Sequence, residues 1–443
     1  MAKRAAAIAI ALLSGLMISS AAAEPAGLEV GESGATPHLK VIVTAPGVYK
    51  ATVAQSYGGG IAEFYNLAAD PEAKVNVAGR LAGLFEVGWH GATWKRPEGA
   101  DPKTCCVNHS LGGDPAKPCY DGVRLWPWES HEGIEGELRV IEKSAARVRV
   151  RTQSWFAAGS CPLKIDKDLP VTAAYTFYPS GRVFVQVRVR RTGALAMHWS
   201  REYGPHLFVG ADNKNAEANL GFTWSTPESG DIQGERAPTK SEALVLTRSE
   251  KAKTNLMVTV PPEEQTLFTQ NMRHNGRSVN WDRAGYGSGN IVMQPGYDST
   301  WACMIEMGTT GGALVPELKT GKDALPFALD YRTPAKIEGA TLVTDEPGDF
   351  NKDGFNESEG CWVLKGPGPV EFTFAKGAGA GFAPAFKLVG WNKDAPKSVR
   401  IDGKDVPCIA AVVQGAPDAS TPSLLVQVMG TVVPEKAKIE IGK

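Results

Sequence analysis

Side chains capable of acid–base chemistry concentrate in one short segment, Trp199-Ser200-Arg201-Glu202-Tyr203-Gly204-Pro205-His206. Histidine titrates near neutral pH, and a tyrosine hydroxyl beside a cation loses its proton more easily. We therefore predict that Tyr203 and His206 transfer protons with help from Arg201. A buried histidine satisfied by the backbone is an equally good interpretation of His206.

A second polar cluster lies in the turn-rich segment between residues 271 and 286. It combines Arg, His, Asn, Trp and Tyr, which suit recognition of hydroxyl and carboxylate groups but also occur in ordinary loops. We predict that this segment forms the opposite wall of the site. Its candidates are His274 for catalysis and Arg277, Trp281, Arg283 and Tyr286 for substrate binding.

The most specific short motif is the oxygen-rich segment at residues 349–360. Its predicted calcium ligands are Asp349, Asn351, Asp353, Glu357 and the carbonyl of Phe355, with Gly354 at the sharp turn. The spacing resembles the DxNxDGxxDxxxG loop of FG-GAP repeats, with Glu357 at the ninth position. It departs from an EF-hand because Gly360 occupies position twelve and a strand, Cys361–Leu364, is expected next. A structural calcium ion is the prediction, and a polar turn without metal is the alternative.

The elements that must position the first cluster form a β-hairpin. Residues 171–177 and 183–189 alternate strictly between two faces, and Pro179-Ser180-Gly181 supplies the turn. One face should pack on a core while the other meets water or a ligand. A second hairpin, at 138–155, precedes it.

Arginines line one face of both hairpins. Arg147, Arg149 and Arg151 alternate with valines in the first hairpin, and the second carries Arg182, Arg188 and Arg190. If these strands share a sheet, the face could attract an acidic ligand such as a uronic-acid polymer. The alternative is a solvated face whose charges prevent aggregation.

The segment at 91–135 is rich in proline and glycine and shows little periodicity, as in a functional or cross-linked loop. Trp126 and Trp128 could lie beside a sugar, or pack within a lid. We predict that Cys105 or Cys106 pairs with Cys119 and that the other pairs with Cys161. A third bridge, Cys361–Cys408, would leave Cys303 free.

A wider resemblance covers about the first two thirds of the chain. Four features occur in the order seen in the galactose mutarotase-like supersandwich. They are a glycine-bounded strand at 58–67, the Tyr178-Pro179-Ser180-Gly181-Arg182 hairpin, the segment Gly204-Pro205-His206-Leu207-Phe208, and Gln294-Pro295-Gly296 before the strand at 300–307. That group includes aldose epimerases and polysaccharide lyases. The resemblance implies a sugar substrate and an acid–base role for His206, without a matching catalytic glutamate.

The domain organisation follows from these segments. Residues 1–23 combine Lys3 and Arg4 with an apolar run and small residues before Glu24, which is typical of a signal peptide and predicts a secreted or periplasmic protein. Many glycines (49) and prolines (30) with short Val- and Thr-rich runs predict an all-β chain. We expect a large antiparallel supersandwich at 24–312, a linker at 313–336 and a smaller C-terminal β-sandwich at 337–443 that carries the calcium loop.

Three functional hypotheses remain open. The first is a lyase acting on a uronate-containing poly- or oligosaccharide, the second a non-catalytic carbohydrate-binding or cell-surface protein, and the third a sugar epimerase. Hydrolysis would require two carboxylates, and no spacing singles out a pair among Glu86, Glu129 and Glu202. The net charge of -1 gives no drive toward nucleic acid or an anionic membrane, and no later run is apolar enough to span a bilayer.

Overall fold

The computed structural model describes residues 26–36, 38–55, 59–78, 85–90, 137–157, 165–192, 197–199, 201–208, 218–224, 229–231, 242–249, 253–262, 268–269, 278–283, 291–293, 295–309, 316, 318, 321–414, 421–430 and 432–443. The predicted signal peptide lies outside these residues. Among the helices that they form, none is long and apolar enough to cross a membrane.

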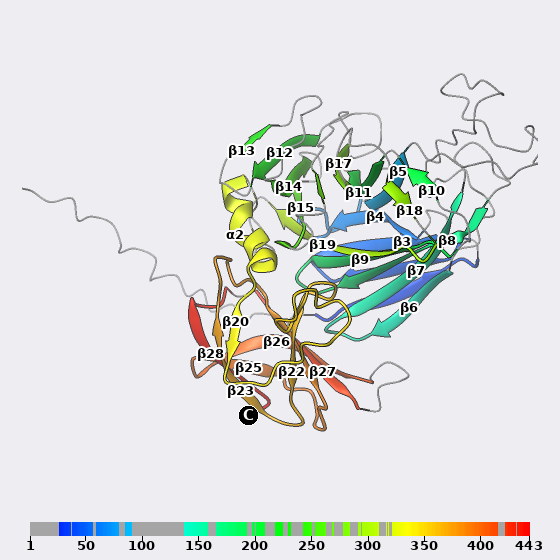
Figure 1. Ribbon diagram of the computed structural model, residues 1–443. Coiled ribbons are helices and arrows are strands. Elements are labelled where there is room, and N and C mark those ends of the chain that lie inside the picture. The colour runs from blue at the N-terminus through cyan, green and yellow to red at the C-terminus, as the bar shows by residue number, and fades with distance from the viewer. Residues whose placement is uncertain are drawn as a thin grey trace, which may run out of the picture.

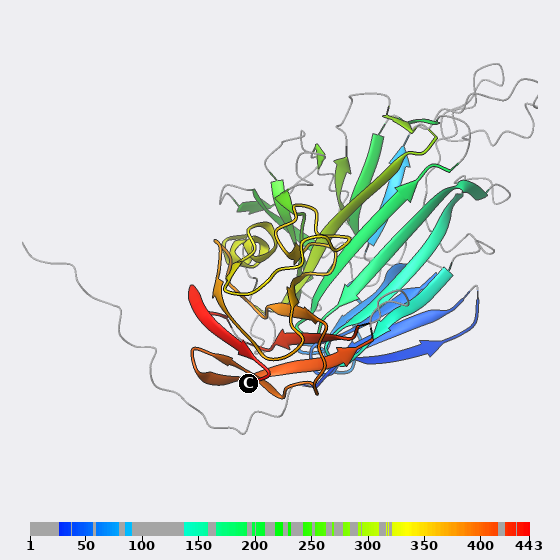
Figure 2. The ribbon, with the colours of Figure 1, turned by 60° about the horizontal axis from the view of Figure 1, so that its bottom comes forward.

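Two β-sheets pack face to face in the first part of the chain. The smaller sheet contains β1 (Glu29–Ser33), β2 (Lys40–Ala45), β3 (Tyr49–Ala54) and β4 (Gly60–Asn66), in that order. The larger sheet has the order β13-β12-β14-β15-β19-β9-β8-β7-β6. Its strands are β6 (Glu137–Lys143), β7 (Val148–Ala157), β8 (Ile165–Phe177), β9 (Arg182–Arg190), β12 (Ala218–Trp224), β13 (Ser229–Asp231), β14 (Glu242–Ser249), β15 (Thr254–Thr259) and β19 (Asp298–Thr309). The two sheets share one hydrophobic core, and this arrangement of packed strands confirms the all-β prediction. The long strands β6 to β9 run side by side in Figure 2.

The predicted hairpin is confirmed as β8 and β9. Their antiparallel register pairs Val171 with Val189 and Phe177 with Val183. Gly181 closes the turn with a φ of 90°, a conformation that favours glycine. The valines at 183, 185, 187 and 189 are fully buried, so the period-two pattern identified the core face correctly.

A third group of short strands lies above strands β6 to β9 of the large sheet in Figure 1. One sheet has the order β16-β17-β11-β5, and a separate pair joins β10 to β18. The bounds are β5 (Phe85–His90), β10 (Met197–Trp199), β11 (Arg201–Phe208), β16 (Phe268–Thr269), β17 (Ser278–Arg283) and β18 (Ile291–Met293). This group contains the first predicted acid–base cluster.

The C-terminal domain is a sheet that folds over a core of its own, with the order β20-β23-β28-β25-β26-β27-β24-β22-β21. Its strands are β20 (Lys336–Glu338), β21 (Phe355–Asn356), β22 (Cys361–Lys365), β23 (Val370–Ala375), β24 (Ala385–Val389), β25 (Ser398–Ile401), β26 (Lys404–Val413), β27 (Ser423–Val428) and β28 (Lys436–Ile441). Strand β26 makes the fold possible because its first half pairs with β25 and its second half with β27.

A helix connects the two domains. Within the stretch expected to be a linker, residues 321–332 form α2 (Gly321–Arg332), which lies between the upper strands and the C-terminal domain in Figure 1. Ala324, Ala328 and Tyr331 are buried in the core of the C-terminal domain, together with Phe184 and Met304 from the large sheet. The two domains therefore share apolar packing, while the exact boundaries at 312 and 337 stay predictions.

The arginine-lined face is only partly what the sequence suggested. Its strands do share one sheet, but Arg147 and Arg182 are almost completely buried, whereas Arg151, Arg188 and Arg190 are exposed. Near Arg147 and Arg182 the face is neither solvated nor open to an acidic ligand, because the C-terminal domain covers it. Periodicity identifies which residues share a face but not what covers that face.

Arg182 joins three elements at this interface. Its guanidinium pairs with Glu306 on the neighbouring strand β19 and with Asp330 of α2 (2.8 Å), and it donates to the carbonyl of Phe382 (2.7 Å). Asp330 also accepts hydrogen bonds from the backbone nitrogens of Gly381 and Phe382. Sheet, helix and C-terminal domain are therefore held by one buried ionic cluster.

The described cysteines correct one prediction. Cys361 and Cys408 are both buried thiols, so the predicted third disulfide is absent. Cys303 is a buried thiol that takes no part in a disulfide, as expected. Cys361 lies on β22 and Cys408 on β26, and β24 and β27 separate these strands. Three strand spacings amount to roughly 14 Å, well beyond the reach of a disulfide. Cys105, Cys106, Cys119 and Cys161 lie outside the described residues, so their pairing stays a prediction.

Glu306 should make stability depend on pH. Burial, reinforced by Asp330, raises the pKa of Glu306 to about 7 although Arg182 opposes the shift. A raised pKa means that the folded chain holds a proton that the unfolded chain releases, so this stabilisation is complete below pH 4.5 and is lost as the pH rises to 7. Between pH 5 and 8, the free energy of unfolding of wild type should fall by about 3 kcal/mol. The free energy of unfolding of Glu306→Gln should not show this fall, because glutamine does not titrate. Urea titrations measure this difference, with the exposed Glu338→Gln as control, and parallel pH profiles would contradict it.

Candidate functional site

The predicted acid–base residues Arg201, Tyr203 and His206 all lie on β11, between β5 and β17. Tyr203 is paired with Asp282 of β17, and His206 with Asn280. Residues 278–283, expected in an opposite wall, therefore form the adjacent strand of the same sheet. The backbone brings together two clusters that are about 70 residues apart in the sequence.

A β-bulge decides which of these residues share a face. Three residue steps separate Tyr203 from His206 on β11, whereas two steps separate their partners on β17, and likewise on β5. An odd number of steps normally places two residues on opposite faces, and one extra residue in the strand cancels that reversal. Tyr203 and His206 therefore occupy the same face of the sheet.

The register divides the sheet into a polar and a largely apolar face. We define the polar face by the positions Glu86, Gly88 and His90 on β5, Arg201, Tyr203 and His206 on β11, and Asn280 and Asp282 on β17. The other face carries Phe85, Val87 and Trp89 on β5, Glu202 and Leu207 on β11, and Val279, Trp281 and Arg283 on β17. The register thus assigns residue types capable of acid–base chemistry to positions on one face of the sheet.

The predicted substrate-binding residues are placed unevenly. Trp281 and Arg283 lie in the sheet but on the face opposite His206. The other predicted substrate-binding residues, Arg277, Tyr286, Trp126 and Trp128, lie outside the described residues, as does His274, which was predicted to be catalytic.

The polar face also contains Glu86, which the sequence offered only as one of three candidate carboxylates, and His90, which the sequence did not single out. Glu86 is the direct cross-strand partner of His206, and His90 is the partner of Arg201. The signal was available in residues 85–90, where Phe, Val and Trp alternate with Glu, Gly and His. Such alternation separates a polar from an apolar face, but it does not reveal which strands are neighbours.

The acidic loop at 349–360 does gather its carboxylates. Oxygen atoms of Asp349, Asp353 and Glu357 lie within 4.8 Å of one another. Asp349 accepts hydrogen bonds from the backbone nitrogens of Lys352 (2.6 Å) and Gly354 (2.9 Å), and Asn351 accepts one from Asp353 (3.0 Å). This oxygen-rich donor set suits calcium, while the backbone hydrogen bonds also suit a polar turn. The strand predicted after the loop is confirmed as β22.

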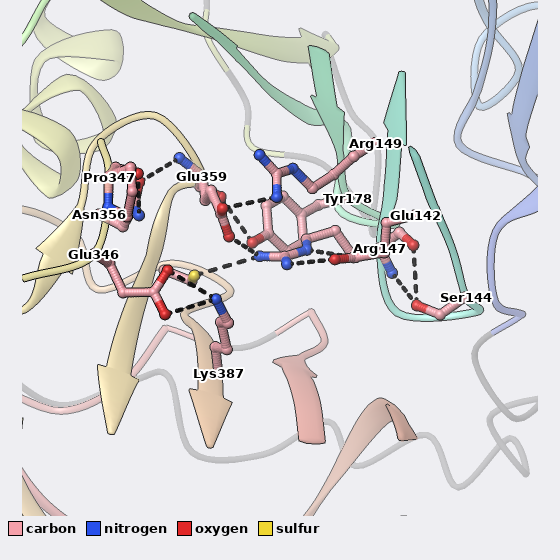
Figure 3. A network of polar contacts seen from close by, with 11 residues as sticks. Glu142, Ser144, Arg147, Arg149, Tyr178, Glu346, Pro347, Asn356, Glu359 and Lys387 are labelled. Carbon is pink, nitrogen blue, oxygen red and sulfur yellow. Dashed lines mark hydrogen bonds and ion pairs between the residues drawn. The ribbon is translucent and has the colours of Figure 1, made fainter. Parts of the chain in front are cut away.

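The end of this loop is fastened to the large sheet. Glu359 pairs with Arg147 (2.7 Å) and Arg149 (2.8 Å), and Arg147 also pairs with Glu142 (2.7 Å), as Figure 3 shows. The hydroxyl of Tyr178 donates to the carbonyl of Glu359 at 2.8 Å. Because Glu359 follows Glu357 by two residues, the loop and the domain interface form one continuous structure.

Electrostatics explain why Glu359 remains charged when buried. Burial alone would raise the pKa of Glu359, but Arg149 and Arg147 outweigh it and hold the pKa far below its ordinary value. A carboxylate with a depressed pKa stabilises the fold above pH 4.5, and its contribution declines as the pH falls toward the folded-state pKa. At neutral pH Glu359 is therefore ionised.

Comparisons with known proteins give distant likenesses only. No family model matches the chain, and no curated protein matches it. Similar solved structures include a TPR-domain containing protein from Parabacteroides distasonis (9% identity, 60% of this chain and 46% of that chain, TM-score 0.33). They also include galactose 1-epimerase from Lactobacillus acidophilus (10% identity, 64% of this chain and 99% of that chain, TM-score 0.38). A third is a putative aldose 1-epimerase from Klebsiella pneumoniae (9% identity, 64% of this chain and 84% of that chain, TM-score 0.37). TM-scores this low do not establish a shared fold.

Removing the charge of Glu359 should destabilise the protein. Glu359→Gln leaves the buried Arg147 and the partly exposed Arg149 without their shared carboxylate. Breaking a buried ion pair from one side typically costs about 3–5 kcal/mol. Urea unfolding at pH 7 measures the loss. The control is Glu371→Gln, which removes an exposed carboxylate that pairs with Lys438. This variant should leave stability nearly unchanged. A Glu359→Gln protein as stable as wild type would contradict the role given to this cluster.

Proposed function

We propose that the chain is an exported enzyme that performs acid–base chemistry on a saccharide, in the class of sugar epimerases. The observation that supports this most is the bulge in β11, which brings Tyr203 and His206 to one face together with Glu86. The exported location follows from the predicted signal peptide alone.

Anomer interconversion needs an acid and a base that act on neighbouring oxygens of one sugar. The base removes the proton of the anomeric hydroxyl while the acid protonates the ring oxygen, and the bond between the anomeric carbon and the ring oxygen breaks. Rotation in the open-chain aldehyde and the reverse transfers then give the other anomer. We assign the base to Glu86 and the acid to His206, because opposite positions in antiparallel strands have Cβ atoms only roughly 5 Å apart.

A uronate lyase is the second candidate, supported by the position of Arg201 on the polar face one row from Tyr203. Elimination needs a base to remove the proton beside the carboxylate, an acid for the leaving oxygen and a cation to neutralise the carboxylate. Tyr203, His206 and Arg201 would fill these roles. Unsaturated products that absorb ultraviolet light would identify a lyase, and binding without product would identify a carbohydrate-binding protein.

The epimerase proposal predicts that single substitutions on the polar face abolish turnover. Glu86→Gln and His206→Asn should each lower the rate of anomer interconversion by ~10²–10⁴-fold without unfolding the protein. Polarimetry on freshly dissolved α-D-galactose and α-D-glucose measures the rate. Val279→Thr is the matched control, because position 279 lies beside Asn280 but on the other face. Equal losses in all three variants, or no catalysis by wild type, would reject the proposal.

We also propose that the acidic loop holds one structural calcium ion, with Asp349, Asn351, Asp353, Glu357 and the Phe355 carbonyl as ligands. The gathered carboxylate oxygens support this, because a divalent cation would offset their mutual repulsion. Bound calcium would stabilise the junction between the loop and the domain interface.

Calcium should therefore raise the stability of the folded chain. At a hundredfold excess over the dissociation constant, the linked stabilisation is ~2.7 kcal/mol. Calorimetry with calcium and with chelator measures the melting temperature of wild type, Asp353→Ala and the control Asp345→Ala, which lies just before the loop. The shift should vanish only in Asp353→Ala. Identical melting temperatures with calcium and with chelator would leave the loop a polar turn.

A further inference from the structure

Part of the large sheet presents arginines to solvent. Beyond the region that the C-terminal domain covers, the outer face carries what we define as the arginine strip, namely Arg139 on β6, Arg151 on β7, and Arg188 and Arg190 on β9. All four residues are exposed. The side chain of Arg188 is 51% exposed although it pairs with Asp298 on β19 (2.7 Å).

The register places these arginines close to one another. Arg151 is paired with Arg139 on one side and with Ala174 of β8 on the other. Arg188 is paired with Thr172, also of β8. Strands β7 and β9 are two strand spacings apart, which is roughly 10 Å. Because Thr172 and Ala174 are short and partly exposed, solvent reaches the surface of the sheet between the arginines.

Two members of the strip have unused hydrogen-bonding capacity. Among the described residues, the side chains of Arg151 and Arg190 take part in no hydrogen bond or ion pair. Like charges directly opposite each other weaken a sheet, yet Arg139 faces Arg151, and Glu137 pairs with Arg139 alone (3.1 Å). A guanidinium presents its donors as a planar fork that matches a carboxylate. The strip therefore offers unused forks to an anionic ligand.

Protection against aggregation does not account for the strip. Charges serve that purpose on edge strands, whose backbone groups are unpaired. Arg188 and Arg190 lie on β9, between β8 and β19, and Arg151 lies on β7, between β6 and β8. These strands already have a partner on both sides. The protective role suggested by the sequence therefore applies only to Arg139, because β6 is the last strand of the sheet.

We propose that the arginine strip binds an acidic polysaccharide, whose uronate carboxylates pair with Arg151, Arg188 and Arg190. Carboxylates that recur along a polymer can pair with arginines on different strands, while the short side chains of β8 leave space for sugar rings between them. Asp298 competes with the ligand for Arg188. This inference goes beyond the proposed function, because it concerns binding and requires no turnover.

The test is calorimetric titration of the full chain at low salt with polygalacturonate, neutral dextran and polyphosphate. Wild type should bind polygalacturonate but not dextran, and added salt should weaken binding because it screens exposed charges. The double variant Arg151→Gln/Arg190→Gln should bind polygalacturonate roughly tenfold more weakly, the scale of two exposed ion pairs. Asp298→Asn should bind it more tightly than wild type, because Arg188 loses a competing carboxylate.

The control is Arg400→Gln, which removes an exposed arginine of the C-terminal domain and should leave the affinity unchanged. Wild-type affinity in the double variant, no tightening in Asp298→Asn, or polyphosphate bound as tightly as polygalacturonate would each overturn the proposal. If the double variant does not fold, Arg151→Lys/Arg190→Lys, which keeps the charge but loses the fork, decides by the same criteria. Binding without anomer interconversion would reject the proposed function and leave this inference standing.

Discussion

The buried guanidinium of Arg182 is the interaction on which the arrangement of the two domains depends. Burying a charge is costly unless it is paired, and here Glu306 and Asp330 both pair with it. Its partners come from the large sheet and α2, and it also binds the carbonyl of Phe382 in the C-terminal domain. Separating these elements would leave the cation or the carboxylates without partners, so they are held as one unit.

This constraint organises the rest of the interface. Around Arg182, aromatic residues from both domains pack together, including Phe184 against Tyr331 and Tyr331 against Phe355. The acidic loop is attached to the same interface by ion pairs, because Glu359 at its end pairs with Arg147 and Arg149. An ion bound in the loop would therefore act on the domain interface as well as on the loop.

The sequence predicted elements better than their partners. Strict alternation identified the hairpin and its buried valines, and ligand spacing identified a loop whose carboxylates do converge. The same alternation placed Arg182 on an outer face, but it could not show that another domain covers that face. Burial by a distant part of the chain leaves no periodic signal in the strand that it covers.

The candidate site was predictable only in part, for a similar reason. Arg201, Tyr203 and His206 stand out because their residue types suit acid–base chemistry. Their common face depends on a bulge, and the partnership with Glu86 depends on strand order. Neither feature can be read from residue types. Cys361 and Cys408 failed as a predicted pair for the same reason, since strand order separates them.

The central claim is that Glu86 and His206 act together on one face of the sheet. A double-mutant cycle tests it most directly, by comparing kcat/KM for sugar interconversion in wild type, Glu86→Gln, His206→Asn and the double variant. Residues that act as a unit are strongly non-additive. The account predicts that the double variant is about as slow as the slower single variant. Losses that simply multiply would show that the two residues work independently, and would contradict the site described above.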